Sequence, residues 1–135
     1  MKLKIYTLFV VTITIISANA QIESKRKEQL SPQKQTLEQP AYQLFSTQNM
    51  WTFIKLDTRN GKMWQVQYDV SGNNRGETIL NSIPLVNIDN EKKGRYTLYP
   101  TQNMYNFILL DQIDGFTYQV QWSTKEENRF VIIIN

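Results

Sequence analysis

The side chains in this chain that could carry out chemistry are few. The sequence contains no histidine and no cysteine, so imidazole or thiolate metal sites and the common nucleophile–base arrangements cannot be built. A carboxylate pair could still hydrolyse a glycoside. However, Asp57 and Asp111 stand at predicted turns, and Glu126 and Glu127 adjoin Lys125 in a polar loop. We therefore expect a protein that is not an enzyme and that holds no metal or other cofactor.

One polar tetrapeptide is a better candidate for a site. TQNM occurs at 47–50 and again at 101–104, and an aromatic residue follows each copy, Trp51 and Tyr105. Amide and hydroxyl groups donate and accept directional hydrogen bonds, and flat aromatic rings offer a large apolar face beside them. This combination suits a sugar or an extended peptide, so a glycan or a protein is the expected partner.

The tetrapeptide belongs to a longer repeat. Residues 42–81 align with 96–135 at a constant offset of 54 without a gap. The near-identical pairs exchange one aromatic residue for another, as at Trp64 and Tyr118. Identity at a fixed offset indicates a duplicated structural unit. The identical pairs include Leu44 with Leu98, Phe53 with Phe107, Leu56 with Leu110, and Gln65 with Gln119.

Each unit has the pattern of four short strands. Apolar and polar residues alternate with a period of two, Val, Ile, Phe, Tyr, Trp and Thr dominate, and turn-forming residues separate the runs. Consecutive short strands of this kind form an antiparallel meander. The predicted strands are 42–45, 50–56, 63–69 and 78–80 in the first unit, and 96–99, 104–110, 117–123 and 131–134 in the second.

The turn between the second and third strands is the best defined. It contains Asn-Gly in one unit and Asp-Gly in the other, where Gly61 and Gly115 can adopt a positive φ. Asp57 and Asp111 begin these turns, where a carboxylate accepts hydrogen bonds from backbone N–H groups two residues on. A calcium loop would need several more oxygen ligands. We interpret all four residues as structural turn residues.

A meander places its first and third connections at the same end of the sheet. Pro100 and the asparagines of the TQNM copies suit turns in the first connection. The polar and aromatic residues of both connections should then gather on one rim, which we predict to be the binding surface. Its members are Thr47, Gln48, Asn49, Trp51, Asn74 and Arg75, with Thr101, Gln102, Asn103, Tyr105, Asn128 and Arg129 from the second unit.

The alternation also predicts which faces are buried. On the third strand Trp64, Val66 and Tyr68 point away from Gln65 and Gln67, which describes one packed face and one wet face. The second unit repeats this pattern, with Tyr118, Val120 and Trp122 opposite Gln119 and Gln121. The second strand is apolar on both sides, so it should be central. We expect an all-β fold in which the two units pack with pseudo-twofold symmetry, as a sandwich, a partly closed barrel or a propeller-blade-like pair.

The chain before the repeats is expected to serve export. Residues 1–20 open with Lys2 and Lys4, continue as an apolar block and close on ANA, as secretory signal peptides do. The block is shorter than the roughly 20 residues that span a bilayer, although an uncleaved anchor is the alternative. Residues 21–40 are polar and lack aromatic residues, so we expect a disordered tether, with a short helix over 22–30 as the alternative.

The predicted organisation is therefore a signal peptide, the tether, and a β domain over 41–135. Within the β domain, residues 82–95 link the two repeats. Without residues 1–20 the formal charge falls from +3 to +1, and residues 41–135 carry nine basic and nine acidic side chains. This balance does not indicate a nucleic-acid partner. We expect the periplasm or the exterior as the location, and no membrane insertion after cleavage.

Three resemblances accompany these patterns. LDTRNGKMW, beginning at Leu56, resembles the turn-and-tryptophan signature of quinoprotein-type β-propeller blades, with one residue fewer between Gly61 and Trp64. Four strands per unit also resemble the two-bladed lectins that close a propeller by oligomerising. The tandem TQNM and QVQW motifs look like those of small secreted proteins of Bacteroidota. These resemblances imply a blade-like β fold and transfer no residue role.

The expected function is that of an exported, non-catalytic recognition module, whose repeated rim binds a glycan or a protein. The alternative is a structural or assembly protein of the cell envelope that forms a homo-oligomer through its β edges. The last run, RFVIIIN at 129–135, supports this alternative, because a free apolar edge strand invites pairing with another chain.

Overall fold

The computed structural model describes residues 38–134. The predicted signal peptide and residues 21–37 of the predicted tether lie outside this range. The described chain consists of β1 (Tyr42–Ser46), β2 (Thr52–Asp57), β3 (Met63–Gln67), β4 (Gly76–Asn81), the 3-10 helix η1 (Ile88–Asn90), β5 (Tyr96–Pro100), β6 (Asn106–Asp111), β7 (Thr117–Gln121), the 3-10 helix η2 (Glu126–Asn128) and β8 (Phe130–Ile134).

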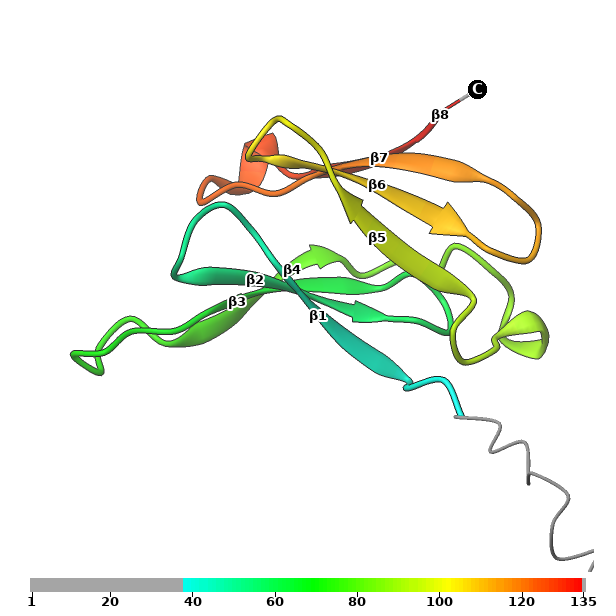
Figure 1. The fold of residues 1–135 in the computed structure, drawn as a ribbon, viewed down its shortest axis with the longest axis horizontal. Coiled ribbons are helices and arrows are strands. Elements are labelled where there is room, and N and C mark those ends of the chain that lie inside the picture. Colours follow the sequence, from blue (N-terminus) through cyan, green and yellow to red (C-terminus); the bar gives the residue numbers. More distant parts are fainter. Residues whose placement is uncertain (1–37, 135) are drawn as a thin grey trace, which may run out of the picture. The chain divides into compact units, whose positions relative to one another are not determined.

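The strands form two antiparallel meanders, one from each sequence repeat. The first sheet has the order β1-β2-β3-β4 and the second the order β5-β6-β7-β8 (Figure 1). The predicted all-β class with two tandem four-stranded units is confirmed. The two sheets are separate and keep their edges, so the partly closed barrel is not the arrangement that forms.

The two sheets are paired in the same register. Leu44 lies opposite Lys55 and Lys55 opposite Trp64 in the first sheet, while Leu98 lies opposite Leu109 and Leu109 opposite Tyr118 in the second. Each residue of the second set follows its counterpart by 54. The exception is a register shift between Met63 and Trp64 in the first sheet. Equivalent positions in sequence are therefore equivalent positions in the sheets.

The tight turns form as their sequences require. Gly61 and Gly115 both have a φ of +79°, which costs a glycine little because it has no Cβ to clash with the backbone. The Asp57 carbonyl oxygen accepts from Gly61 N at 3.0 Å, and the Asp111 carbonyl oxygen accepts from Gly115 N at 2.9 Å. Matching turns keep the matching registers in place.

Each sheet has two faces, which we name by their residues. The aromatic face carries Tyr42, Leu44, Phe53, Lys55, Trp64, Val66, Glu77 and Ile79 in the first sheet, and Tyr96, Leu98, Phe107, Leu109, Tyr118, Val120, Val131 and Ile133 in the second. The glutamine face carries Phe45, Ile54, Leu56 and Gln65 in the first sheet, and Tyr99, Ile108, Leu110 and Gln119 in the second.

The core lies between two different faces. The first sheet buries its glutamine face, including Ile54 and Leu56, whereas the second sheet buries its aromatic face, including Leu98 and Phe107. A twofold axis would bury equivalent residues on both sides of the interface. The packing therefore differs from the pseudo-twofold arrangement that the sequence suggested, and the sheets follow one another head to tail.

The predicted wet and packed faces of the third strand hold for the second sheet, and in the first sheet they are reversed at Gln65 and Tyr68 but not at Gln67, which is exposed as predicted. Val120 and Trp122 are core residues and Gln119 is exposed, as expected. In the first sheet Gln65 is buried and Tyr68 is exposed. The buried Gln65 Oε1 has a hydrogen-bond partner, because it accepts at 2.9 Å from Ser123 N in the connection after β7.

Charged residues explain this choice of faces. Lys55 and Glu77 form an ion pair on the aromatic face of the first sheet, and the equivalent positions in the second sheet are Leu109 and Val131. Burying an ion pair costs desolvation energy that burying two apolar side chains does not. Within one chain, the aromatic face that becomes buried is the one without a counterpart of the Lys55–Glu77 pair.

Candidate functional site

The four connections at one end of the sheets contain the predicted rim residues (Figure 1). In the first TQNM turn, Thr47 Oγ1 accepts from Asn49 N at 3.1 Å and donates to the Thr52 carbonyl oxygen at 2.8 Å. Asn49 Oδ1 accepts from Trp51 N at 2.9 Å. These bonds explain the repeated residues, because threonine and asparagine both stabilise such turns through local hydrogen bonds to the backbone.

The second TQNM turn makes the same bonds. Thr101 Oγ1 accepts from Asn103 N at 3.1 Å and donates to the Asn106 carbonyl oxygen at 2.9 Å. Asn103 Oδ1 accepts from Tyr105 N at 2.9 Å. The threonines and asparagines of both turns therefore hold the backbone of their own turns.

The two turns lie against each other. Gln48 Nε2 reaches the Gln102 carbonyl oxygen at 3.5 Å, so two residues at the same position of the repeat are direct neighbours. A small cavity of about 180 Å³ opens between the turns. Its lining residues are Ser46, Thr47, Gln48, Pro100, Thr101, Asn103, Met104, Asn106 and Phe107.

An exposed aromatic ring stands beside each turn. Trp51 is 37% exposed and packs on Tyr68, with ring centroids 5.4 Å apart. Tyr105 is 46% exposed and packs on Trp122 at 5.3 Å. Each ring has one side held by a neighbouring aromatic and retains exposed surface for contact. Neither residue belongs to the core.

The remaining rim residues mostly have local roles, although Arg129 Nη1 also donates to the Ile79 carbonyl oxygen of the first sheet at 3.4 Å. Asn74 Nδ2 donates to Asp69 Oδ2 at 3.0 Å, and Arg75 Nε donates to the Asp69 carbonyl oxygen at 3.3 Å, so both stabilise their own loop. Arg129 Nε donates to the Ser123 carbonyl oxygen at 2.8 Å. Asn128 shares a cavity of about 270 Å³ with Tyr105. Among these four residues, Asn128 is the one that lines a cavity together with an exposed aromatic residue of the rim.

A second cluster, at the opposite end of the sheets, was not predicted from the sequence. Arg95 is buried and donates through Nε and Nη2 to Asp111 Oδ2, at 3.0 and 2.7 Å. Arg95 also forms an ion pair with Asp114. In the first repeat the counterpart Asp57 is instead paired with Arg59 at 2.8 Å. The sequence signal for this cluster was an arginine directly before β5, together with one aspartate at the end of β6 and another in the β6–β7 turn.

These partners determine the acidity of the two turn carboxylates. Burial alone would raise the pKa of Asp111, but hydrogen bonds from Arg95 and from the N–H groups of Ile113 and Asp114 hold it below its ordinary value of 3.8. For Asp57, burial is likewise outweighed by Arg59, and its pKa is also lowered. A general acid in a glycosidase needs a raised pKa, so the electrostatics of these aspartates favour a structural role.

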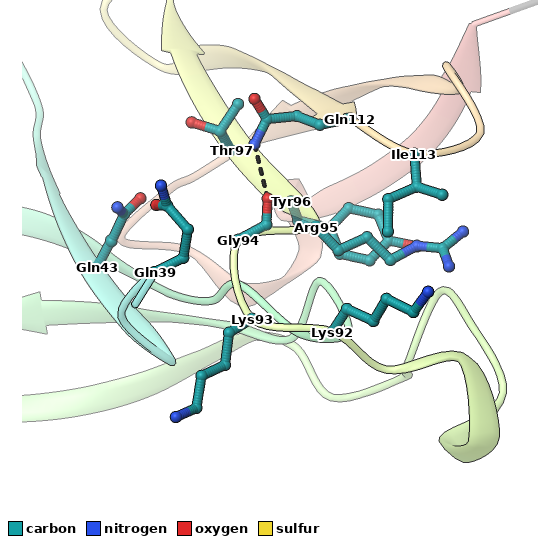
Figure 2. A pocket seen from close by; sticks show the side chains of 10 residues that line it. All are labelled: Gln39, Gln43, Lys92, Lys93, Gly94, Arg95, Tyr96, Thr97, Gln112 and Ile113. Carbon is teal, nitrogen blue, oxygen red and sulfur yellow. Dashed lines mark hydrogen bonds between the residues drawn. The ribbon is translucent and has the colours of Figure 1, made fainter. Parts of the chain in front are cut away.

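The same end carries a larger cavity of about 540 Å³ (Figure 2). Gln112 Nε2 crosses beside it to donate to the Gly94 carbonyl oxygen at 2.7 Å. The other lining side chains come from β1 and the segment before it, from β5 and the segment before it, and from the β6–β7 turn. They are Gln39, Gln43, Lys92, Lys93, Arg95, Tyr96, Thr97 and Ile113.

Within residues 38–134, no group of three or more His, Cys, Asp or Glu side chains could hold a metal ion, and no helix is long and apolar enough to cross a membrane. Comparison with protein families, curated proteins and solved structures finds no significant match.

Proposed function

We propose that this protein is an exported, non-catalytic recognition module that binds a glycan or a protein segment at the paired TQNM turns. The observation that carries this proposal is the contact between Gln48 and Gln102. It joins two copies of one turn into a single surface, with an exposed aromatic ring beside each copy. The periplasm or the exterior as its location follows from the leader-like residues 1–20.

The chemistry of this surface indicates the kind of ligand. Its exposed groups are glutamine amides and aromatic rings, so recognition depends on directional hydrogen bonds and ring stacking. The cavity between the turns is small, about 180 Å³, compared with roughly 300–1,000 Å³ for sites that enclose a drug-sized molecule. The surface therefore suits an extended ligand, such as a glycan chain or a peptide, that lies across both turns.

Binding arrays test this proposal. Glycan and peptide arrays are probed with the wild-type protein and with a Trp51→Ala/Tyr105→Ala double variant. The control is Phe116→Ala, which removes a similarly exposed aromatic from the β6–β7 turn at the other end of the sheets. We expect the double variant to bind its ligand about tenfold more weakly or worse and the control to bind normally. Equal binding by the wild type and a folded double variant would contradict the proposal.

The open sheets support the assembly protein as a second candidate. Each sheet ends in two edge strands, and the C-terminal strand β8 exposes Ile132, Ile133 and Ile134. Edge strands pair readily with other chains unless charges or prolines block them. A molecular mass that stays monomeric at rising concentration would remove this candidate and leave the recognition role unaffected.

A further inference from the structure

Two sheet faces of this protein are left uncovered by its own fold. The first sheet leaves its aromatic face open, with Leu44 and Ile79 exposed. The second sheet leaves its glutamine face open, with Tyr99 and Ile132 exposed. Grouped apolar residues on an exposed face mark interaction surfaces more often than isolated ones do.

These two open faces are copies of the two faces that already pack together. Inside the chain, the glutamine face of the first sheet meets the aromatic face of the second. The open faces are the aromatic face of the first sheet and the glutamine face of the second. A second copy of the chain could therefore cover either open face. Its glutamine face would pack on the open aromatic face, or its aromatic face on the open glutamine face, as the two sheets already do within one chain.

The residues of the open glutamine face match those of the buried one in part, since Thr117 stands where the buried face has the core residue Met63. Ile108 and Leu110 correspond to the core residues Ile54 and Leu56. Gln119 corresponds to Gln65, whose Oε1 accepts from Ser123 N across the internal interface. The bond that Gln119 makes within the chain uses its nitrogen, which donates to Asn106 Oδ1 at 2.8 Å. Its oxygen is suited to accept from Asp69 N, the counterpart of Ser123, in a second copy.

The cavity of Figure 2 fits the same arrangement. In the internal interface, Thr58 Oγ1 accepts from Gly94 N at 3.0 Å, and the Thr58 carbonyl oxygen accepts from Tyr96 N at 2.8 Å. Gln112, the counterpart of Thr58, lines the cavity. In an assembled pair, Tyr42 at the start of β1 in a second copy would lie beside Gln112. This matches the position of Tyr96, at the start of β5, beside Thr58 within one chain.

We propose that this protein assembles with copies of itself head to tail, the open aromatic face of one copy packing on the open glutamine face of the next. Such a contact joins unlike surfaces, so it continues into a ring when the rotation closes and into a chain when it does not. The proposal does not depend on the TQNM surface. It uses sheet faces, whereas the assembly alternative above uses sheet edges.

One departure limits the strength of the contact. Lys55 and Glu77 replace the Leu109 and Val131 of the buried copy and form an ion pair, and Lys55 Nζ lies 4.7 Å from the ring centroid of Trp64. The pair would have to be desolvated on assembly. We therefore expect reversible, concentration-dependent association, strengthened about tenfold or more when Lys55→Leu and Glu77→Val are combined.

Two single substitutions at exposed positions block one face each. Leu44→Glu blocks the aromatic face and Ile132→Glu blocks the glutamine face, and the shared negative charge prevents the two altered faces from attracting each other. Thermal unfolding and circular dichroism are used to check that both variants are folded. A further variant adds Ile132→Glu to the Lys55→Leu/Glu77→Val protein. It should no longer assemble if association uses the proposed contact, whereas nonspecific hydrophobic association would persist.

Sedimentation over a range of concentrations gives the readout. We expect the wild type to associate, each blocked variant to remain monomeric, and an equimolar mixture of the two to form a one-to-one dimer through their intact faces. A wild type that stays monomeric, a blocked variant that still associates, or a mixture that stays monomeric would each overturn the proposal. The proposal would also be overturned if the Lys55→Leu/Glu77→Val protein still assembled after Ile132→Glu was added.

Discussion

Leu44 and Leu98 occupy the same position in two matching sheets, yet Leu44 is 61% exposed and Leu98 is 3% exposed. The pair shows that duplication of a sequence does not duplicate an environment. Each sheet meets the other with a different face, so the energetic role of every repeated residue depends on which copy it belongs to. The predictions below use matched pairs of residues to measure that difference.

The leucine pair gives the first prediction. Leu98→Ala should destabilise the protein by about 2–5 kcal/mol, because it removes buried apolar surface and leaves a cavity. Leu44→Ala, the same change in the other repeat, should cost about 0.5 kcal/mol or less. Urea unfolding at a concentration that keeps the protein monomeric measures both. Equal losses would mean that the two sheets bury the same face.

The repeated glutamines give the second prediction. Gln65→Leu should cost about 1–3 kcal/mol, because it leaves the N–H of Ser123 without its acceptor at the interface between the sheets. Gln119→Leu should change the unfolding free energy of the monomer by about 0.5 kcal/mol or less. Chemical denaturation of the two variants checks this contrast, which would be wrong if Gln119→Leu were the more harmful change.

The buried arginine gives the third prediction. Arg95→Met should cost about 3–5 kcal/mol, because Asp111 would remain buried without its cationic partner. Lys93→Met removes the same charge two residues away, from an exposed pair with Glu38, and should have no measurable effect because exposed ion pairs contribute little. The melting temperatures of both variants are compared with that of the wild type.

The lowered pKa values give the fourth prediction. Asp57 and Asp111 have folded-state pKa values below 3.8, so the folded state favours their charged forms. Their contribution is fully present above the unfolded pKa and is lost as the pH falls through the folded values. Stability should therefore fall on acidification below about pH 4. Asp111→Asn should be less stable at neutral pH and should show a shallower acid loss in denaturation measured from pH 7 to pH 2.

The two turn glycines give the fifth prediction. Both have a φ of +79°, so replacing either with alanine should cost about 1–2 kcal/mol of backbone strain. At Gly61 a Cβ would also lie 2.7 Å from Leu85 Cδ1, whereas at Gly115 it would meet no atom within 4 Å. Gly61→Ala should therefore be the more destabilising variant in thermal unfolding. A larger loss for Gly115→Ala would contradict this account.

Much of the candidate site was predictable from local sequence. The matching turns formed by Thr47 and Asn49 and by Thr101 and Asn103 follow from residue types that bond to nearby backbone. The contact between Gln48 and Gln102 was not predictable, because it depends on how one sheet is placed against the other. Arg95 was missed for the same reason, since its partner Asp111 lies in a different connection.

The sequence by itself determined the strands, their order and their register. Alternation, turn residues and a gapless offset of 54 are local properties, and strand pairing in a meander follows directly from them. Only the tertiary structure decided which face of each sheet forms the core. The central strands β2 and β6 are apolar on both sides, so either face could be buried. The outcome depended on charges such as Lys55 and Glu77, which are costly to bury only when an opposing sheet excludes water from them.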